Sequence, residues 1–167
     1  MRARSGGTRR FRQGATRVAL MLSVVSALSL VLAVSSGCAS HAIHWSRLSL
    51  VAAVDANANH PVAVDLVLSA DAEMSDRLAG LSAAQWFAQR ETLQALFPNR
   101  LRYIAREVVP GQTLALPRAH MTSRRANAAF VFARYGTPGV HRARIATWRG
   151  AVTVQLGPER IDVVMDR

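Results

Sequence analysis

The amino-acid sequence predicts a mainly β fold, a β-sandwich of about eight strands with one inserted α-helix. Three observations support this prediction. Apolar and polar residues alternate in several short segments of the chain, which is typical of half-buried strands. Glycine and proline turn signals separate these segments at short intervals, as in an all-β sandwich. One stretch, residues 83–97, instead repeats its large apolar residues with helical spacing.

Eight segments carry the strand pattern. Their ranges are 47–54, 62–68, 101–109, 113–116, 128–135, 142–148, 151–156 and 161–165. The first is expected to bury one face made of Leu48, Leu50, Ala52 and Val54. The second is expected to bury Val62, Val64, Leu66 and Leu68. Asp65 and Ser69 indicate that its other face is more exposed to solvent. Asparagine and proline between these two segments, in residues 56–61, predict a loop.

Turn signals follow the later strands. They are Pro110-Gly111, Gly136-Thr137-Pro138-Gly139, Arg149-Gly150 and Gly157-Pro158. The predicted helix begins after Ser82, with Gln85 three residues later completing a capping-box pattern. Trp86, Leu93 and Phe97 form its apolar stripe, and Pro98 ends it. Residues 71–80 are polar and are expected to be irregular.

The N-terminal segment has the pattern of a secretory signal. Six arginines precede Val18–Val34, an apolar run without charge, and the small residues 35–37 lead to Cys38, the single cysteine of the chain. Residues 35–38 resemble the lipobox of bacterial lipoproteins, in which the cysteine thiol becomes a lipid-bearing thioether. The resemblance implies a signal peptide at 1–37, a lipidated tether at 38–46 and a β-sandwich domain at 47–167.

Three alternatives to the lipoprotein signal remain at this stage. Ordinary signal peptidase would cut near Ser36 or Ser40. The apolar run would be retained as a membrane helix, although 17 residues are short for a span of roughly 20. Cys38 would be an ordinary buried thiol. Arg9-Arg10 also resembles a twin-arginine signal. Ala39 after the cysteine, by resemblance to enterobacterial sorting rules, indicates the outer membrane, facing the periplasm.

Composition argues against a nucleic-acid-binding protein and against a disulfide-stabilised fold. The full chain has a net charge of +11, but residues 38–167 hold 15 arginines against 10 acidic residues, a net charge of +5. This mild excess gives no case for nucleic-acid binding. A single cysteine allows no intramolecular disulfide, so stability depends on the core alone.

The sequence predicts no enzyme, no cofactor and no metal site. There is no nucleophile-elbow or phosphate-loop pattern, and the five histidines are scattered. One secondary candidate for partner binding is a patch of arginines and aromatic residues, because these types are enriched at binding hot spots. It consists of Phe87, Arg142, Arg144 and Trp148. The alternatives are a solvated sheet face for the arginines and an edge of the core for Phe87.

The order of features resembles one family, the outer-membrane lipoprotein of type VI secretion systems (TssJ, also called SciN-like). The residues that carry the resemblance follow in chain order: Cys38, Leu48–Ala53, Pro61–Val64, Trp86-Phe87, Arg106–Gln112, Ala129–Tyr135 and Trp148-Arg149. One departure is Leu66–Ser69, where the family often has a tyrosine-glutamine-leucine-like stretch. This departure indicates a diverged branch or a related accessory lipoprotein.

The resemblance implies a transthyretin-like sandwich and a structural role. Acylated Cys38 would hold the protein in outer-membrane lipid, and the protein would bind the periplasmic domain of a large inner-membrane partner (TssM-like). The loop between the first two strands would contribute to that contact, through Ala56, Asn57, Ala58, Asn59 and His60. A second hypothesis, from another class, is a periplasmic lipoprotein that binds a small ligand or a cell-wall fragment.

Overall fold

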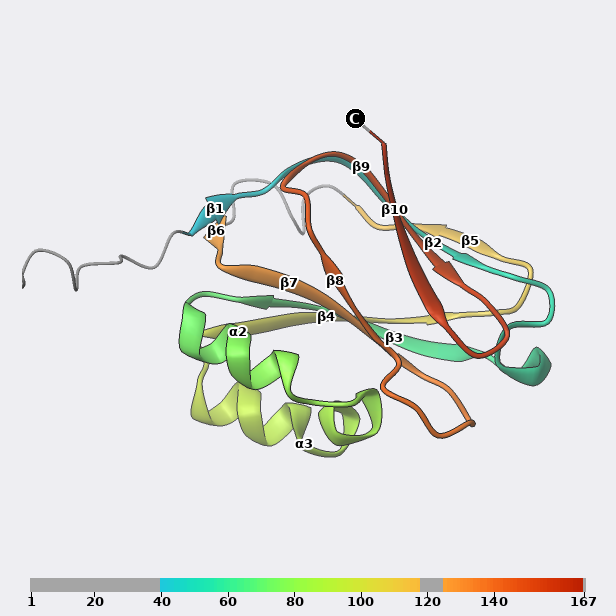
Figure 1. Cartoon of the computed structure of the whole chain (residues 1–167), viewed down its shortest axis with the longest axis horizontal. Helices are drawn as coiled ribbons and strands as arrows, with labels where there is room; N and C mark the ends of the chain where they lie inside the picture. The colour runs from blue at the N-terminus through green and yellow to red at the C-terminus, as the bar shows by residue number, and fades with distance from the viewer. Residues whose placement is uncertain (1–39, 118–124, 167) are drawn as a thin grey trace, which may run out of the picture. The chain divides into compact units, whose positions relative to one another are not determined.

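Two four-stranded β-sheets pack face to face, and two helices cover the outer face of one of them (Figure 1). This computed structural model describes residues 40–117 and 125–166. The predicted signal peptide and Cys38 lie outside the described residues. The predicted mainly β sandwich is confirmed, with two helices in place of the single one expected.

The first sheet has the strand order β10-β9-β2-β5. Its strands are β2 (His44–Ala52), β5 (Thr113–Ala115), β9 (Arg149–Leu156) and β10 (Ile161–Asp166). β2 and β9 run parallel, and β5 and β10 pair antiparallel at the two edges. The sheet therefore joins the start and the end of the described chain.

The second sheet has the order β4-β3-β7-β8 and is antiparallel throughout. Its strands are β3 (Val62–Ser69), β4 (Leu101–Val108), β7 (Ala128–Arg134) and β8 (Arg142–Ile145). A short additional ladder pairs β1 (His41–Ala42) with β6 (Arg125–Ala126). A 3₁₀ turn, η1 (Ala56–Asn59), connects β2 to β3.

The sandwich core lies between the two sheets and is built from alternate residues of the central strands. β3 contributes the predicted face and β7 contributes Val131, while β2 and β9 of the opposite sheet contribute residues that include Leu48, Leu50, Val152 and Val154, all of them buried. Val54 is the exception in the predicted set. It lies beyond the end of β2 and is 76% exposed.

A second core lies under the helices α2 (Ala72–Ala79) and α3 (Ala83–Leu96). Trp86 and Leu93 of α3 pack there with Val67, Phe130 and Phe132 of the second sheet. The expectation that Asp65 and Ser69 face water is wrong, because the helices cover this face of β3 and both side chains are buried. A strand that is buried on both faces does not alternate between apolar and polar residues. In β7 every residue up to Ala133 is buried.

The predicted capping box of α3 is confirmed. Gln85 N–H donates to Ser82 Oγ at 3.3 Å, and Ser82 N–H donates to Gln85 Oε1 at 2.8 Å. The expectation of an irregular segment at 71–80 is wrong. Asp71 caps α2 by accepting from Met74 N–H at 2.9 Å, and Arg100 donates to both Asp71 oxygens at 2.7 and 2.8 Å.

Residues 41–46, expected to form part of a tether, belong largely to β1 and β2 and are paired with neighbouring strands. Arg149 and Gly150, expected to form a turn, begin β9 opposite His44 and Trp45.

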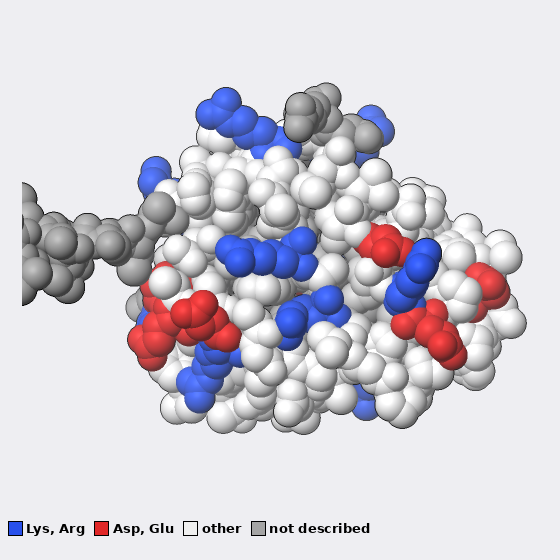
Figure 2. Space-filling view, in the orientation of Figure 1, with Lys and Arg blue, Asp and Glu red and all other residues white. Residues whose placement is uncertain are grey.

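On the face that Figure 2 shows, acidic and basic side chains meet at the two sides, and basic side chains without acidic neighbours lie between them. No helix within the described residues is long and apolar enough to cross a membrane.

Candidate functional site

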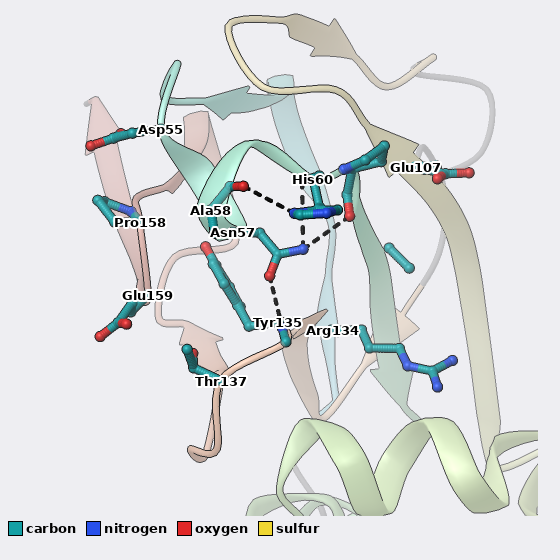
Figure 3. Close-up of a pocket in the computed structure, with 13 residues that line it drawn as sticks. Asp55, Asn57, Ala58, His60, Glu107, Arg134, Tyr135, Thr137, Pro158 and Glu159 are labelled. Carbon is teal, nitrogen blue, oxygen red and sulfur yellow. Dashed lines mark hydrogen bonds between the residues drawn. The ribbon is translucent and has the colours of Figure 1, made fainter.

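Three loops meet at one end of the sandwich and enclose an open cavity of about 640 Å³ (Figure 3). They are the turn between β2 and β3, the loop between β7 and β8, and the loop between β9 and β10. The side chains around the cavity are Asp55, Asn57, Ala58, His60, Pro61, Ala63, Glu107, Arg134, Tyr135, Thr137, Pro158 and Glu159.

The turn η1 has an unusual backbone. Asn57, Ala58 and Asn59 have φ angles of 49°, 51° and 64°, all in the left-handed region. Asparagine adopts this region several-fold more often than most residues, whereas a left-handed alanine costs roughly 1–2 kcal/mol. Such a conformation persists only when surrounding contacts determine it.

Asn57 supplies those contacts. Its Oδ1 accepts from Gly136 N–H at 2.7 Å, and its Nδ2 donates to Pro61 O at 3.1 Å (Figure 3). Its backbone N–H donates to Pro158 O at 3.0 Å. One residue therefore fixes the turn to the loops on both sides.

Tyr135 connects the β7–β8 loop to the β9–β10 loop. Its hydroxyl lies 2.9 Å from Arg160 O and 3.1 Å from Gly157 O, and its single proton is shared between these two carbonyls. Burial, and secondarily the negative charge of Asp162, raises the pKa of Tyr135 to about 12. The phenol therefore stays protonated and able to donate.

The exposed rim of this end carries Asp55, Ala58, Asn59, His60 and Glu159. His60 Nδ1 lies 2.9 Å from Ala58 O and donates to it as the Nδ1–H tautomer. The cavity has acidic groups in Asp55, Glu107 and Glu159 and a basic group in Arg134. A rigid loop cluster with mixed charge is suited to contact with another macromolecule.

The structure divides the predicted loop residues by burial. Ala56 is buried in the sandwich core and offers no surface. Asn57 is half-buried and structural, as described above. Ala58, Asn59 and His60 are exposed and are the loop residues available to a partner.

The secondary patch is not one surface. β8 ends at Ile145, so the expectation that Trp148 shares a strand face with Arg142 and Arg144 is wrong. Trp148 instead stacks on Trp45 and His41, with ring centroids 6.4 and 5.1 Å apart.

The other three members of the patch pack beside the helices. Phe87 is half-buried against the second core, and Arg90 lies 5.2 Å from its ring centroid. Arg142 donates to Leu81 O at 2.6 Å, and exposed Arg144 lies 5.9 Å from the ring centroid of Phe130.

Tyr135, Glu107 and Glu159 were not anticipated as part of a site. The turn signal at 136–139 marks a loop, but which loops meet depends on the strand order. Among residues 40–117 and 125–166, no three histidine, cysteine, aspartate or glutamate side chains come together as metal ligands would.

No family model matches the chain, and no curated protein matches it. Comparison with solved structures identifies a class of fold, the helix-covered sandwich of type VI secretion lipoproteins. The T6SS lipoprotein TssJ1 from Pseudomonas aeruginosa is 17% identical, with a TM-score of 0.59 over 76% of this chain and 98% of that one. The chain therefore has the fold of TssJ1, as the resemblance in the sequence implies.

Two further structures are similar at lower TM-scores. Serratia marcescens Lip, described as a membrane-bound component of the type VI secretion system, is 19% identical, with a TM-score of 0.49 over 71% of this chain and 96% of that one. The C-terminal domain of the T6SS protein TssM from EAEC is 15% identical, with a TM-score of 0.47 over 72% of this chain and 97% of that one.

Proposed function

We propose that the protein is a non-enzymatic, lipid-anchored component of a type VI secretion membrane complex. In this proposal it tethers the periplasmic domain of a TssM-like inner-membrane protein to the outer membrane. The observation that carries the proposal is the common fold with TssJ1 over nearly the whole length of that protein.

The anchor is acylated Cys38, at the exit of the predicted signal peptide. Each buried methylene of an acyl chain contributes about 0.8 kcal/mol, and one chain alone binds a membrane only marginally. The bacterial lipoprotein modification supplies more than one chain, so attachment is stable. Placement in the outer membrane rests on Ala39 at the following position.

The partner contact is at the loop end. β2 leads from the N-terminal end of the described domain to η1, so its nine residues separate the two ends by roughly 30 Å. Exposed Ala58, Asn59 and His60 then face away from the anchor. Their backbone is held in one conformation by Asn57, which lowers the entropy lost when a partner binds.

The anchor is tested by Cys38→Ser. Because the thioether cannot form, we expect an unprocessed precursor and no acylated species in the mass spectrum. Parent protein analysed in parallel is the control and carries acyl groups on residue 38. Normal maturation and membrane attachment of the variant would refute the lipid assignment.

The partner site is tested by Ala58→Arg. Arginine and alanine pay a similar penalty at positive φ, so the change adds bulk and charge without new backbone strain. We expect binding to the TssM-like partner, followed by co-purification, to weaken about tenfold or more, a loss of about 1.4 kcal/mol in binding free energy. Leu96→Arg is the matched control, since Leu96 is 65% exposed at the end of α3 and away from the loop. Equal binding by the two variants would exclude the loop.

The cavity favours one alternative function. Its volume of about 640 Å³ is within the range of small-ligand sites, roughly 300–1,000 Å³. The protein would then be a periplasmic lipoprotein that binds a small ligand or a cell-wall fragment. Calorimetric titration with soluble peptidoglycan fragments tests this alternative, and heat that disappears in Glu159→Gln would support it. Buried side chains fill the space between the sheets, so such a ligand would bind at the surface, as in the cavity at the loop end.

A further inference from the structure

The described chain begins very close to the proposed anchor. Ser40 is two residues after Cys38 and is held by Arg125, which donates to Ser40 Oγ at 3.0 Å and to Ser40 O at 2.7 Å. His41 and Ala42 then pair with β6. Two extended residues span at most about 7 Å. A lipidated Cys38 therefore brings this end of the sandwich against the membrane surface, because no long flexible linker separates the two.

The same end carries an aromatic stack that reaches from the core to the surface. Trp45 is buried, and its Nε1 donates to Thr147 O at 2.8 Å. Trp148 stacks on Trp45 with an interplanar angle of 5°, and exposed His41 also stacks on Trp148, at 16°. The stack is held in place by His44 N–H, which donates to Trp148 O at 2.7 Å.

A shallow groove of about 440 Å³ runs beside this stack. It is lined by His41, Ala42, His44, Ala146, Thr147, Trp148 and Arg149. None of these residues is acidic. Arg125 and Arg47, both exposed, are close by on β6 and β2. At the edge, Met165 of β10 is exposed and pairs in register with Val152 of β9.

Acidic residues near this end lie on other elements. Asp71 and Glu73, at the start of α2, are both bound by Arg100. Asp166 ends β10 and pairs in register with Ala151. The groove itself therefore presents an indole, two imidazoles and an arginine, without a carboxylate in its lining.

We propose that this end of the sandwich, the face formed by His41, His44, Arg125, Trp148 and Arg149, docks on the phospholipid surface that holds the anchor. The inference rests on the proposed lipidation of Cys38. Trp148 lies at the headgroup level, where tryptophan is enriched in membrane proteins. Arg125 and Arg149 contact lipid phosphates, and each arginine near an anionic surface contributes about a fivefold gain in binding. The sandwich then stands on the membrane in a fixed orientation, with η1 pointing away from it.

The test uses the full chain, produced in a bacterium with lipoprotein-processing enzymes. The purified protein is reconstituted into vesicles of phosphatidylethanolamine and phosphatidylglycerol whose acyl chains are brominated near the headgroup. Bromine quenches only tryptophans that approach the lipid. Trp45 and Trp86 are buried and serve as internal references. We expect part of the fluorescence to be quenched, and we expect Trp148→Phe to remove the quenched part.

Two further variants test how much the arginine charges contribute to docking on the membrane. Arg149→Gln is expected to lower the quenching, and added salt is expected to lower it in the parent protein. Arg160→Gln is the matched control, because Arg160 is exposed at the loop end. It is expected to leave the quenching unchanged.

The outcomes separate the docking face from the anchor. Mass spectrometry of the same sample reports the lipid on Cys38. A lipidated protein without Trp148-dependent quenching would overturn the docking face and leave the proposed function standing. A protein without lipid on Cys38 would overturn both, because the short link to the membrane would not exist.

Discussion

The ion pair between Asp65 and Arg90 joins α3 to the second sheet and allows a quantitative prediction. Asp65 is 1% exposed and lies in the centre of β3. Trp86 Nε1 donates to its Oδ2 at 2.8 Å, and Arg90 Nη1 lies 2.9 and 3.2 Å from its two oxygens. The hydrogen bond to Asp65 raises the pKa of Arg90 above its ordinary value, so Arg90 stays charged.

Arg90→Met removes the cation and leaves a buried carboxylate with the indole as its side-chain donor. Breaking a buried pair in this way costs about 3–5 kcal/mol. The Arg90 side chain is 27% exposed, so water can partly replace it, and we expect a loss of about 3 kcal/mol. Asp65→Asn retains an acceptor for Trp86 and lets Arg90 extend into water, so we expect a loss of about 1 kcal/mol.

The double variant tests the reasoning. With Asp65→Asn and Arg90→Met together, no unpaired charge is buried, so the loss should be smaller than in Arg90→Met alone. Urea unfolding followed by circular dichroism measures these values. With a slope of about 2 kcal/mol per molar, a loss of 3 kcal/mol moves the midpoint by about 1.5 M. Arg77→Met is the control. Arg77 is exposed on α2 and lies 5.5 Å from the ring centroid of Phe97, so its loss should change stability by about 1 kcal/mol or less. A double variant whose loss equals the sum of the two single losses would refute the argument.

Two predictions concern pH. Tyr135 has a pKa raised to about 12, so its contribution to stability is complete below pH 10 and is lost as the pH rises from 10 to 12. Measured by alkaline unfolding, Tyr135→Phe should lack this loss, and a curve parallel to that of the parent protein would contradict the prediction. Asp71 has a pKa lowered to about 2, first by the hydrogen bond from Arg100, so its contribution is complete above pH 3.8 and is lost as the pH falls towards 2. Arg100→Gln should therefore reduce the acid sensitivity of unfolding, and unchanged acid sensitivity would show that the pair contributes nothing.

Much of the sandwich was predictable because one face of each strand enters the core. The apolar residues of β3 from Val62 to Leu68 and the capping box of α3 were predicted correctly, since each depends on residues only a few positions apart. The loop character of residues 56–61 was predicted for the same reason, through its asparagines and proline.

The failures depend on contacts between distant residues. Asp65 suggests an exposed face until Trp86 and Arg90 are known to lie over it. The helix α2 has a local signal, an aspartate cap with Met74 and Leu78 four residues apart, but its polar composition concealed it. The cavity at the loop end requires the parallel pairing of β2 with β9, which no short pattern in one sequence specifies.

The pairing of β2 has a mechanical consequence. β2 extends from the N-terminal end of the domain to the η1 turn, and eight of its residues are in register with β9. A pull applied between these two ends is carried by the covalent backbone of β2, which the ladder with β9 already holds extended. The domain therefore transmits such tension from its first strand to its exposed turn without lengthening and without loading its hydrogen bonds.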